Sequence, residues 1–165
     1  MATATYTPIA TQTLGSAAAS ITFSSIPGTY TDLRLVLTCT TSVSGDTVVA
    51  QFNSDTTANY SNTYLLGTGT SVFSGNNSSV TSAPIGIGAT TSTTIPTLFS
   101  TDIQSYAGAT NKAFLSSGSS DQNGSGNVAI TIHLWRSTAA ITSIKLFLAG
   151  GNNFATGTIA TISGI

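Results

Sequence analysis

Residues 128–135 read VAITIHLW and carry the clearest structural pattern of the chain. Two sets of side chains alternate along this stretch, one being Val128, Ile130, Ile132 and Leu134 and the other Ala129, Thr131, His133 and Trp135. A repeat of two residues places successive side chains on opposite faces of an extended strand. The stretch therefore predicts a β-strand with at least one buried face, and the pattern leaves open which face that is.

The same alternation recurs on both sides of this stretch. Strong strands are predicted at residues 33–40, 47–52 and 144–148, and weaker ones at residues 7–14, 20–23, 62–66, 81–87, 98–105, 112–116 and 156–162. Glycine- and asparagine-rich turns separate them, among them residues 74–77, 123–127 and 150–153. About ten short strands at this spacing are typical of an antiparallel sandwich or barrel.

These strands predict an all-β fold, with residues 1–165 forming a single antiparallel β-sandwich domain of about ten strands. We expect a jelly-roll-like arrangement, with a plain immunoglobulin-like sandwich as the alternative. The Ser/Thr-rich middle, residues 68–97, contains enough apolar residues to predict long loops around one strand at 81–87 rather than a domain boundary. The C-terminal residues 158–165 stay apolar and β-prone, so we expect the last strand to be held in the sheet or in a neighbouring molecule.

The composition is unusually poor in charge. Charged residues make up 5% of the chain and the net charge is −1, while 40% of the residues are hydrophobic. Four scattered bases cannot form the basic stripe that nucleic-acid binding needs, so no nucleic-acid partner is expected. No run reaches the length of a membrane span, and no membrane partner is expected. A surface with so little charge favours association, so we expect an oligomer or part of a larger assembly.

No set of residues predicts catalysis, a cofactor or a metal site. The one histidine, His133, lies in mid-strand, where a structural or interface role is the expectation, and five dispersed aspartates do not indicate a catalytic pair. The segment 121–127 resembles a calcium loop but has Ile132 where the bidentate glutamate would stand, so we interpret it as a hairpin loop. Cys39, the one cysteine, is expected to be buried as a small apolar side chain.

Four aromatic residues allow a second interpretation. Tyr60, Tyr64, Tyr106 and Trp135 could form a platform on which sugars stack, an interface with another protein, or part of the core.

Four segments resemble small β-rich structural proteins of tailed bacteriophages, many of them from cyanophages and other marine phages. They are ITFSSIPGTYTDLRL (21–35), FNSDTTANYSNTYLLGTG (52–69), IQSYAGATNK (103–112) and ITSIKLFLAGGNNFATGTIATISGI (141–165). The chain departs from the family pattern at Gly28, where glutamine is usual, and at Ser54, where glycine is usual. The resemblance implies a non-enzymatic structural component of a virion.

We therefore expect a capsid decoration (cement) protein that binds the outer capsid surface and stabilises the shell. Its partners would be the major capsid protein and copies of itself, as a homotrimer, in a virion assembled in the host cytoplasm. The alternative is a tail-fibre or receptor-binding module that recognises host surface glycans; a bacterial carbohydrate-binding module and an enzyme rank below it. The interface is expected at the two chain ends, at Tyr6, Ile9, Ile162 and Ile165, and at the long Ser/Thr loops.

Overall fold

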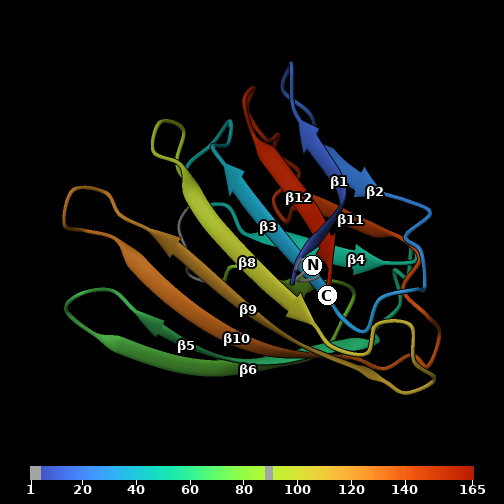
Figure 1. Ribbon diagram of the computed structural model, residues 1–165. Helices are drawn as coiled ribbons and strands as arrows, with labels where there is room; N and C mark the ends of the chain where they lie inside the picture. Colours follow the sequence, from blue (N-terminus) through green and yellow to red (C-terminus); the bar gives the residue numbers. More distant parts are fainter. Residues whose placement is uncertain (1–4, 88–90) are drawn as a thin grey trace.

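The chain folds into two antiparallel β-sheets of unequal width that pack as a sandwich (Figure 1). The computed structural model describes residues 5–87 and 91–165, and within these ranges it contains twelve strands and no helix. None of the described residues forms a helix that could cross a membrane. The expectation of an all-β antiparallel sandwich is confirmed.

The large sheet has eight strands. In spatial order they are β1 (Thr7–Thr13), β12 (Ile159–Gly164), β3 (Leu33–Cys39), β8 (Thr97–Ile103), β9 (Lys112–Ser120), β10 (Asn127–Trp135), β5 (Tyr60–Gly67) and β6 (Val72–Val80). The last strand, β12, lies between β1 and β3, so the C-terminal segment is held inside the sheet, as its apolar sequence predicts.

The small sheet has four strands, in the order β2 (Ser20–Phe23), β11 (Ile144–Leu148), β4 (Val48–Phe52) and β7 (Ala83–Pro84). Strands distant in sequence pair in both sheets, which gives the sandwich its jelly-roll-like order. Figure 1 shows one end of β9, β10, β5 and β6 extending well beyond the small sheet.

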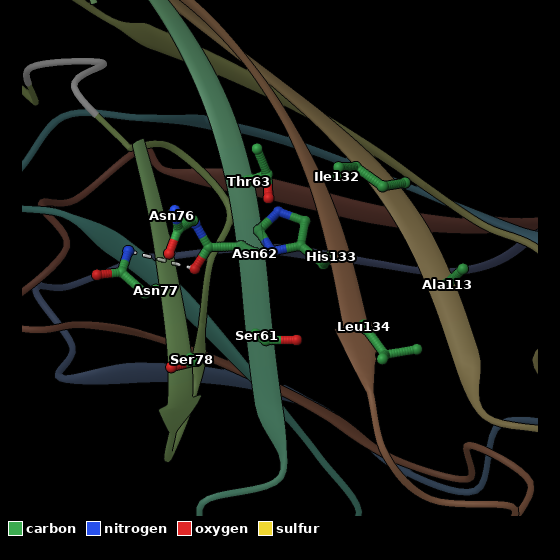
Figure 2. Close-up of a pocket in the computed structure, with 10 residues that line it drawn as sticks. All are labelled: Ser61, Asn62, Thr63, Asn76, Asn77, Ser78, Ala113, Ile132, His133 and Leu134. Carbon is green, nitrogen blue, oxygen red and sulfur yellow. Dashed lines mark hydrogen bonds between the residues drawn. The ribbon is translucent and has the colours of Figure 1, made fainter. Parts of the chain in front are cut away.

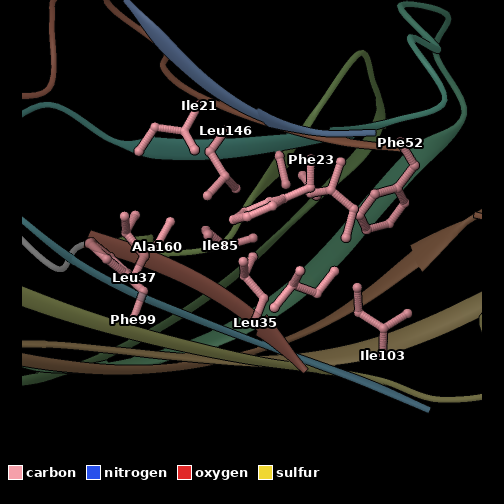
Figure 3. Close-up of a cluster of buried hydrophobic side chains, with 14 of the residues drawn as sticks. Ile21, Phe23, Leu35, Leu37, Phe52, Ile85, Phe99, Ile103, Leu146 and Ala160 are labelled. Atoms are coloured by element: carbon pink, nitrogen blue, oxygen red, sulfur yellow. The ribbon is translucent and has the colours of Figure 1, made fainter. Parts of the chain in front are cut away.

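One apolar cluster fills the space between the sheets. Figure 3 shows Ile21 and Leu146 of the small sheet facing Leu35 and Leu37 of the large sheet. These residues belong to the alternating sets of strands β2, β11 and β3, whose apolar face points inward. Burial of these alternate apolar side chains is what holds the two sheets together.

Phe52, at the end of β4, links this cluster to the large sheet. Its ring centroid lies 5.0 Å from Phe114 on β9 and 5.5 Å from Trp135 on β10, both in edge-to-face geometry. Its backbone N–H donates a hydrogen bond of 2.9 Å to the hydroxyl of Tyr60 on β5. Phe52 therefore contacts three strands of the opposite sheet, β9 and β10 through its ring and β5 through its backbone.

The Ser/Thr-rich middle differs from the sequence expectation. Residues 72–80, predicted as loop and turn, form the nine-residue strand β6, while the strand predicted at 81–87 is reduced to the two residues of β7. β6 lies at the edge of the large sheet, and almost all of its side chains are exposed. Such a strand has no buried face and hence no apolar alternation; its pairing with β5 places it in the sheet.

Truncation of Phe52 tests its role as the link between the sheets. We expect Phe52→Ala to lower the free energy of unfolding by about 3–5 kcal/mol, since it removes a fully buried aromatic side chain and leaves a cavity. The matched control is Phe73→Ala on β6, which removes a half-exposed ring and should cost far less. Urea denaturation of the three proteins measures both values; equal losses for the two variants would contradict the assignment.

Candidate functional site: an exposed apolar face of the large sheet

The side chains of β10 divide between the two faces of the sheet in an unexpected way. Ala129, Thr131, His133 and Trp135 point inward and are at most 2% exposed. The more apolar set points outward, with Val128, Ile130 and Ile132 between 46% and 65% exposed. The strand therefore buries its threonine and histidine and leaves its valine and isoleucines on the surface.

Trp135 accounts for this orientation. Its ring stacks on Tyr60, with centroids 6.2 Å apart, and its indole N–H donates a hydrogen bond of 2.7 Å to Oδ2 of Asp55. Because side chains alternate along a strand, burying Trp135 in this cluster turns residues 133, 131 and 129 inward and residues 132, 130 and 128 outward.

Asp55 is held by several donors as well as Trp135. Burial by itself raises the pKa of this carboxyl, but hydrogen bonds from Thr57, Asn59 and Trp135 more than compensate and bring the pKa below its usual range. The carboxylate is therefore charged at neutral pH and accepts the indole N–H as a strong, charge-assisted hydrogen bond.

Neighbouring strands extend the apolar surface. Ile130 pairs with Leu65 on β5, and Ile132 pairs with Leu115 on β9, so these side chains lie on the same side of the sheet. Leu65 is 54% exposed and Leu115 is 43% exposed. We call the set Leu65, Leu115, Val128, Ile130 and Ile132 the apolar face. A shallow hollow of about 300 Å³ lies among all of its members except Val128, bordered also by Thr63, Tyr64 and Ser74.

Charge is almost absent around the apolar face. Residues 56–101 contain no charged side chain, and β10 has none either. The one charged residue within β9 is Lys112, which is buried and donates hydrogen bonds from Nζ to the carbonyl oxygens of Gly108 and Thr110. On the neighbouring strand β8, Asp102 lies directly opposite Leu115 and borders this face, where it forms an ion pair of 3.4 Å with Arg34. Apolar contact and shape, rather than ion pairing, would therefore dominate binding to this face.

A second hollow, of about 410 Å³, adjoins the first and is bordered by hydroxyl and amide side chains as well as by Ile132 and Leu134 (Figure 2). Asn62 on β5 and His133 on β10 are paired neighbours here, and Asn77 on β6 donates a hydrogen bond of 3.4 Å to Oδ1 of Asn62. Asn76 and Ser78 of β6 also border the hollow. Neutral amides and hydroxyls would suit a polar, uncharged surface.

His133 has an apolar environment. Its ring stacks on Phe114 with centroids 4.6 Å apart, and neither ring nitrogen has a hydrogen-bond partner among the described residues. Burial lowers the pKa of His133 to about 3. The ring therefore lacks the carboxylate that orients the base of a catalytic triad.

The structure places the residues predicted for an interface in different environments. Tyr6 and Ile165 are exposed and lie at the same end of the sheet, because β1 and β12 pair there. Ile9 is half-buried against the core. Ile162 differs from the expectation: it points inward from β12 and is completely buried, so its side chain is not available to a partner in this fold.

The aromatic platform considered for sugars is not formed. Tyr60, Tyr106 and Trp135 are buried in the core, and only Tyr64 is half-exposed. Their apolar rings fill the space between the sheets instead of lining a surface.

Other sequence candidates take structural roles. Asp121, at the start of the suspected calcium loop, accepts a hydrogen bond from the backbone N–H of Gly124 and closes a turn between β9 and β10. Within residues 5–87 and 91–165, no three His, Cys, Asp or Glu side chains are grouped as a metal site would require. Cys39 is buried as expected, and burial raises the pKa of its thiol to about 12.

Comparison with known proteins does not assign a family. No protein-family model matches the chain, and no curated protein matches it. A solved structure of the LG1-3 region of the laminin alpha2 chain is similar over 80% of this chain, with 10% sequence identity and a TM-score of 0.33. The chain corresponds to 25% of the length of that structure. A similarity at this level carries no functional argument.

The burial of His133 predicts a pH dependence of stability. The unfolded chain takes up a proton near pH 6.5, whereas the folded ring does so only near pH 3, so stability present above pH 6.5 is lost as the pH falls between these values. The loss amounts to up to about 1.4 kcal/mol per pH unit. We expect His133→Phe to remove this contribution.

Denaturation series between pH 7 and 4.5 measure the effect, as the difference between the wild type and His133→Phe. The control is Thr131→Val, which changes a buried side chain on the same face that does not titrate. In this variant the free energy of unfolding should fall with pH as steeply as in the wild type. If the free energy of unfolding changed equally with pH in the wild type and in His133→Phe, His133 would be accessible to protons in the folded protein.

Proposed function

We propose that the chain is a structural protein of a bacteriophage virion, a capsid decoration protein that attaches to the outer shell through the apolar face. The single observation that carries the proposal is the cluster of five half-exposed aliphatic side chains, which is bordered on the β8 side by the ion pair of Arg34 and Asp102. Val128, Ile130 and Ile132 of β10 point to the solvent, while the smaller or more polar Ala129, Thr131 and His133 of the same strand are buried.

A surface of this kind favours a protein partner. Contiguous apolar side chains on a soluble domain mark interaction sites, and the fully buried centre of a protein interface is depleted in charge. Hydroxyl and amide groups on β5 and β6 would form a polar rim. The side chains of the apolar face are therefore suited to being covered by another protein.

The resemblance to virion proteins of tailed phages supports the choice of partner. Its segment 141–165 contains strands β11 and β12, the segment 52–69 contains β5, and the segment 21–35 contains most of β2 and the start of β3. These strands build the scaffold of both sheets and one edge of the apolar face. The similarity therefore concerns the parts of the chain that determine the fold and part of the proposed attachment surface.

Stabilisation of the capsid shell would follow from the effect of binding on the assembly equilibrium. A protein that binds across neighbouring capsid subunits stabilises the assembled shell because it binds the assembled state better than the separate subunits. Burial of aliphatic side chains supplies the free energy, at roughly 25 cal/mol per Å² of apolar surface. Since almost no charge is involved, attachment should depend only weakly on salt.

A charge within the apolar face tests the proposal. We expect Ile130→Lys to weaken attachment to decoration-free shells by at least about tenfold, because a lysine would be forced into an apolar contact. The control is Thr13→Lys, which adds the same charge at an exposed position of β1, on the opposite edge of the sheet. Occupancy is measured by co-sedimentation with shells, and circular dichroism checks that both variants fold.

Copy number in purified virions separates the alternatives. Hundreds of copies per particle would support a decoration protein, whereas a few tens would place the chain on the tail and make glycan binding the next test. Equal occupancy of shells by Ile130→Lys and Thr13→Lys would contradict attachment through the apolar face.

A further inference from the structure

The edge of the large sheet at β6 is open to pairing. Within the described residues, β6 pairs with β5 on one side and with no strand on the other. Nearly all of its side chains are exposed, including Val72 at 78%. An edge strand presents a row of backbone N–H and C=O groups that a further strand can bind.

The other edges of the two sheets are protected. β1 contains Pro8, which lacks an N–H, and its register shifts between Pro8 and Ala10. β2 has four residues, and β7 has two and includes Pro84. By contrast β6 is nine residues long and contains neither a proline nor a charged residue, the devices by which sheet edges are usually kept from associating. Its one irregularity is at the Val80 end, where the register with β5 shifts.

We propose that β6 pairs antiparallel with β6 of a second copy of this chain, across a two-fold axis that passes beside Asn76. The contact would continue the eight-stranded sheet from one molecule into the next. It is independent of the attachment to a capsid proposed above and joins copies in pairs, separately from any threefold contact.

The sequence of β6 is suited to pairing with itself. With Asn76 at the axis, Ser74 lies opposite Ser78 of the second copy and Val72 opposite Val80, so like residues meet on this side of the strand. On the other side, Gly75 lies opposite Asn77 and Phe73 opposite Ser79. We expect regular pairing over residues 74–78, because Ser79 has a positive φ of 55° that ends the extended stretch. Paired hydroxyls and amides can bond across strands, and no like charges face each other.

A two-fold pairing of β6 with itself is favoured over a head-to-tail contact between copies. β1 is the edge that a head-to-tail contact would use, and Pro8 with its register shift weakens it. A perpendicular two-fold axis keeps the same side of both sheets facing the same way. Val72 and Ser74 lie on the same side as Leu65, so the apolar faces of the two copies would become one continuous surface.

Sedimentation velocity of the free chain tests the contact. Because so short an edge buries little area, we expect a weak dimer that forms at concentrations approaching the millimolar range. Asn76→Lys should raise the dimer dissociation constant by about tenfold or more, since it places two like charges next to the axis. Thr13→Lys, with the same added charge on β1, should dimerise as the wild type does.

Disulfide trapping tests the geometry. Residues facing each other in antiparallel strands have Cα atoms about 4.5–5.5 Å apart, which a disulfide can span. Asn76→Cys should therefore form a covalent dimer under oxidising conditions and Thr13→Cys should not, while the buried Cys39 stays unreactive. A wild-type chain that remains monomeric throughout, or a dimer that Asn76→Lys leaves intact and Asn76→Cys does not trap, would overturn the proposal. Neither measurement involves a capsid, so its failure would leave the proposed function untouched.

Discussion

The burial of Trp135 between Tyr60 and Phe52, with its indole N–H bound to Asp55, determines how the outer half of the large sheet is oriented. Side chains alternate strictly along a strand, so one anchored residue decides the face of all the others. This orientation also buries His133, two residues before Trp135, although its ring nitrogens have no hydrogen-bond partner among the residues that the structure describes. The benefit is an aliphatic surface that the fold itself does not need.

The unequal width of the two sheets has a second consequence. Four strands cannot cover eight, and the strands nearest β6 extend beyond the small sheet (Figure 1). The first and last strands, by contrast, both lie at the opposite edge, where β12 pairs with β1 and β3. The β5–β6 side therefore ends in an open strand edge next to the apolar face, and both the capsid attachment and the pairing of copies are proposed there.

Much of the fold could be predicted from the sequence. The predicted strand at residues 20–23 coincides with β2 and that at 144–148 with β11, because both have a buried face that repeats every two residues. β6 could not be predicted in this way, because a strand with both faces exposed has no such repeat and depends on pairing with β5.

For β10, the sequence predicts the strand but not which of its two sets of side chains points into the core. Aliphatic side chains suggest an inward face, and the actual arrangement depends on a contact between Trp135 and residues far away in sequence. The same limitation explains Ile162, whose apolar character fits an interface and a core equally well.

Thiol labelling of β10 tests most directly whether the aliphatic set faces the solvent. Cys39 is buried and its pKa is raised to about 12, so a single introduced cysteine would be the reactive thiol of the folded chain. We expect Ile130→Cys to react with a soluble disulfide reagent nearly as fast as a free thiol, and Thr131→Cys to be strongly protected until the protein unfolds. Rapid labelling of Thr131→Cys together with protection of Ile130→Cys would contradict the orientation of β10, and with it the apolar face.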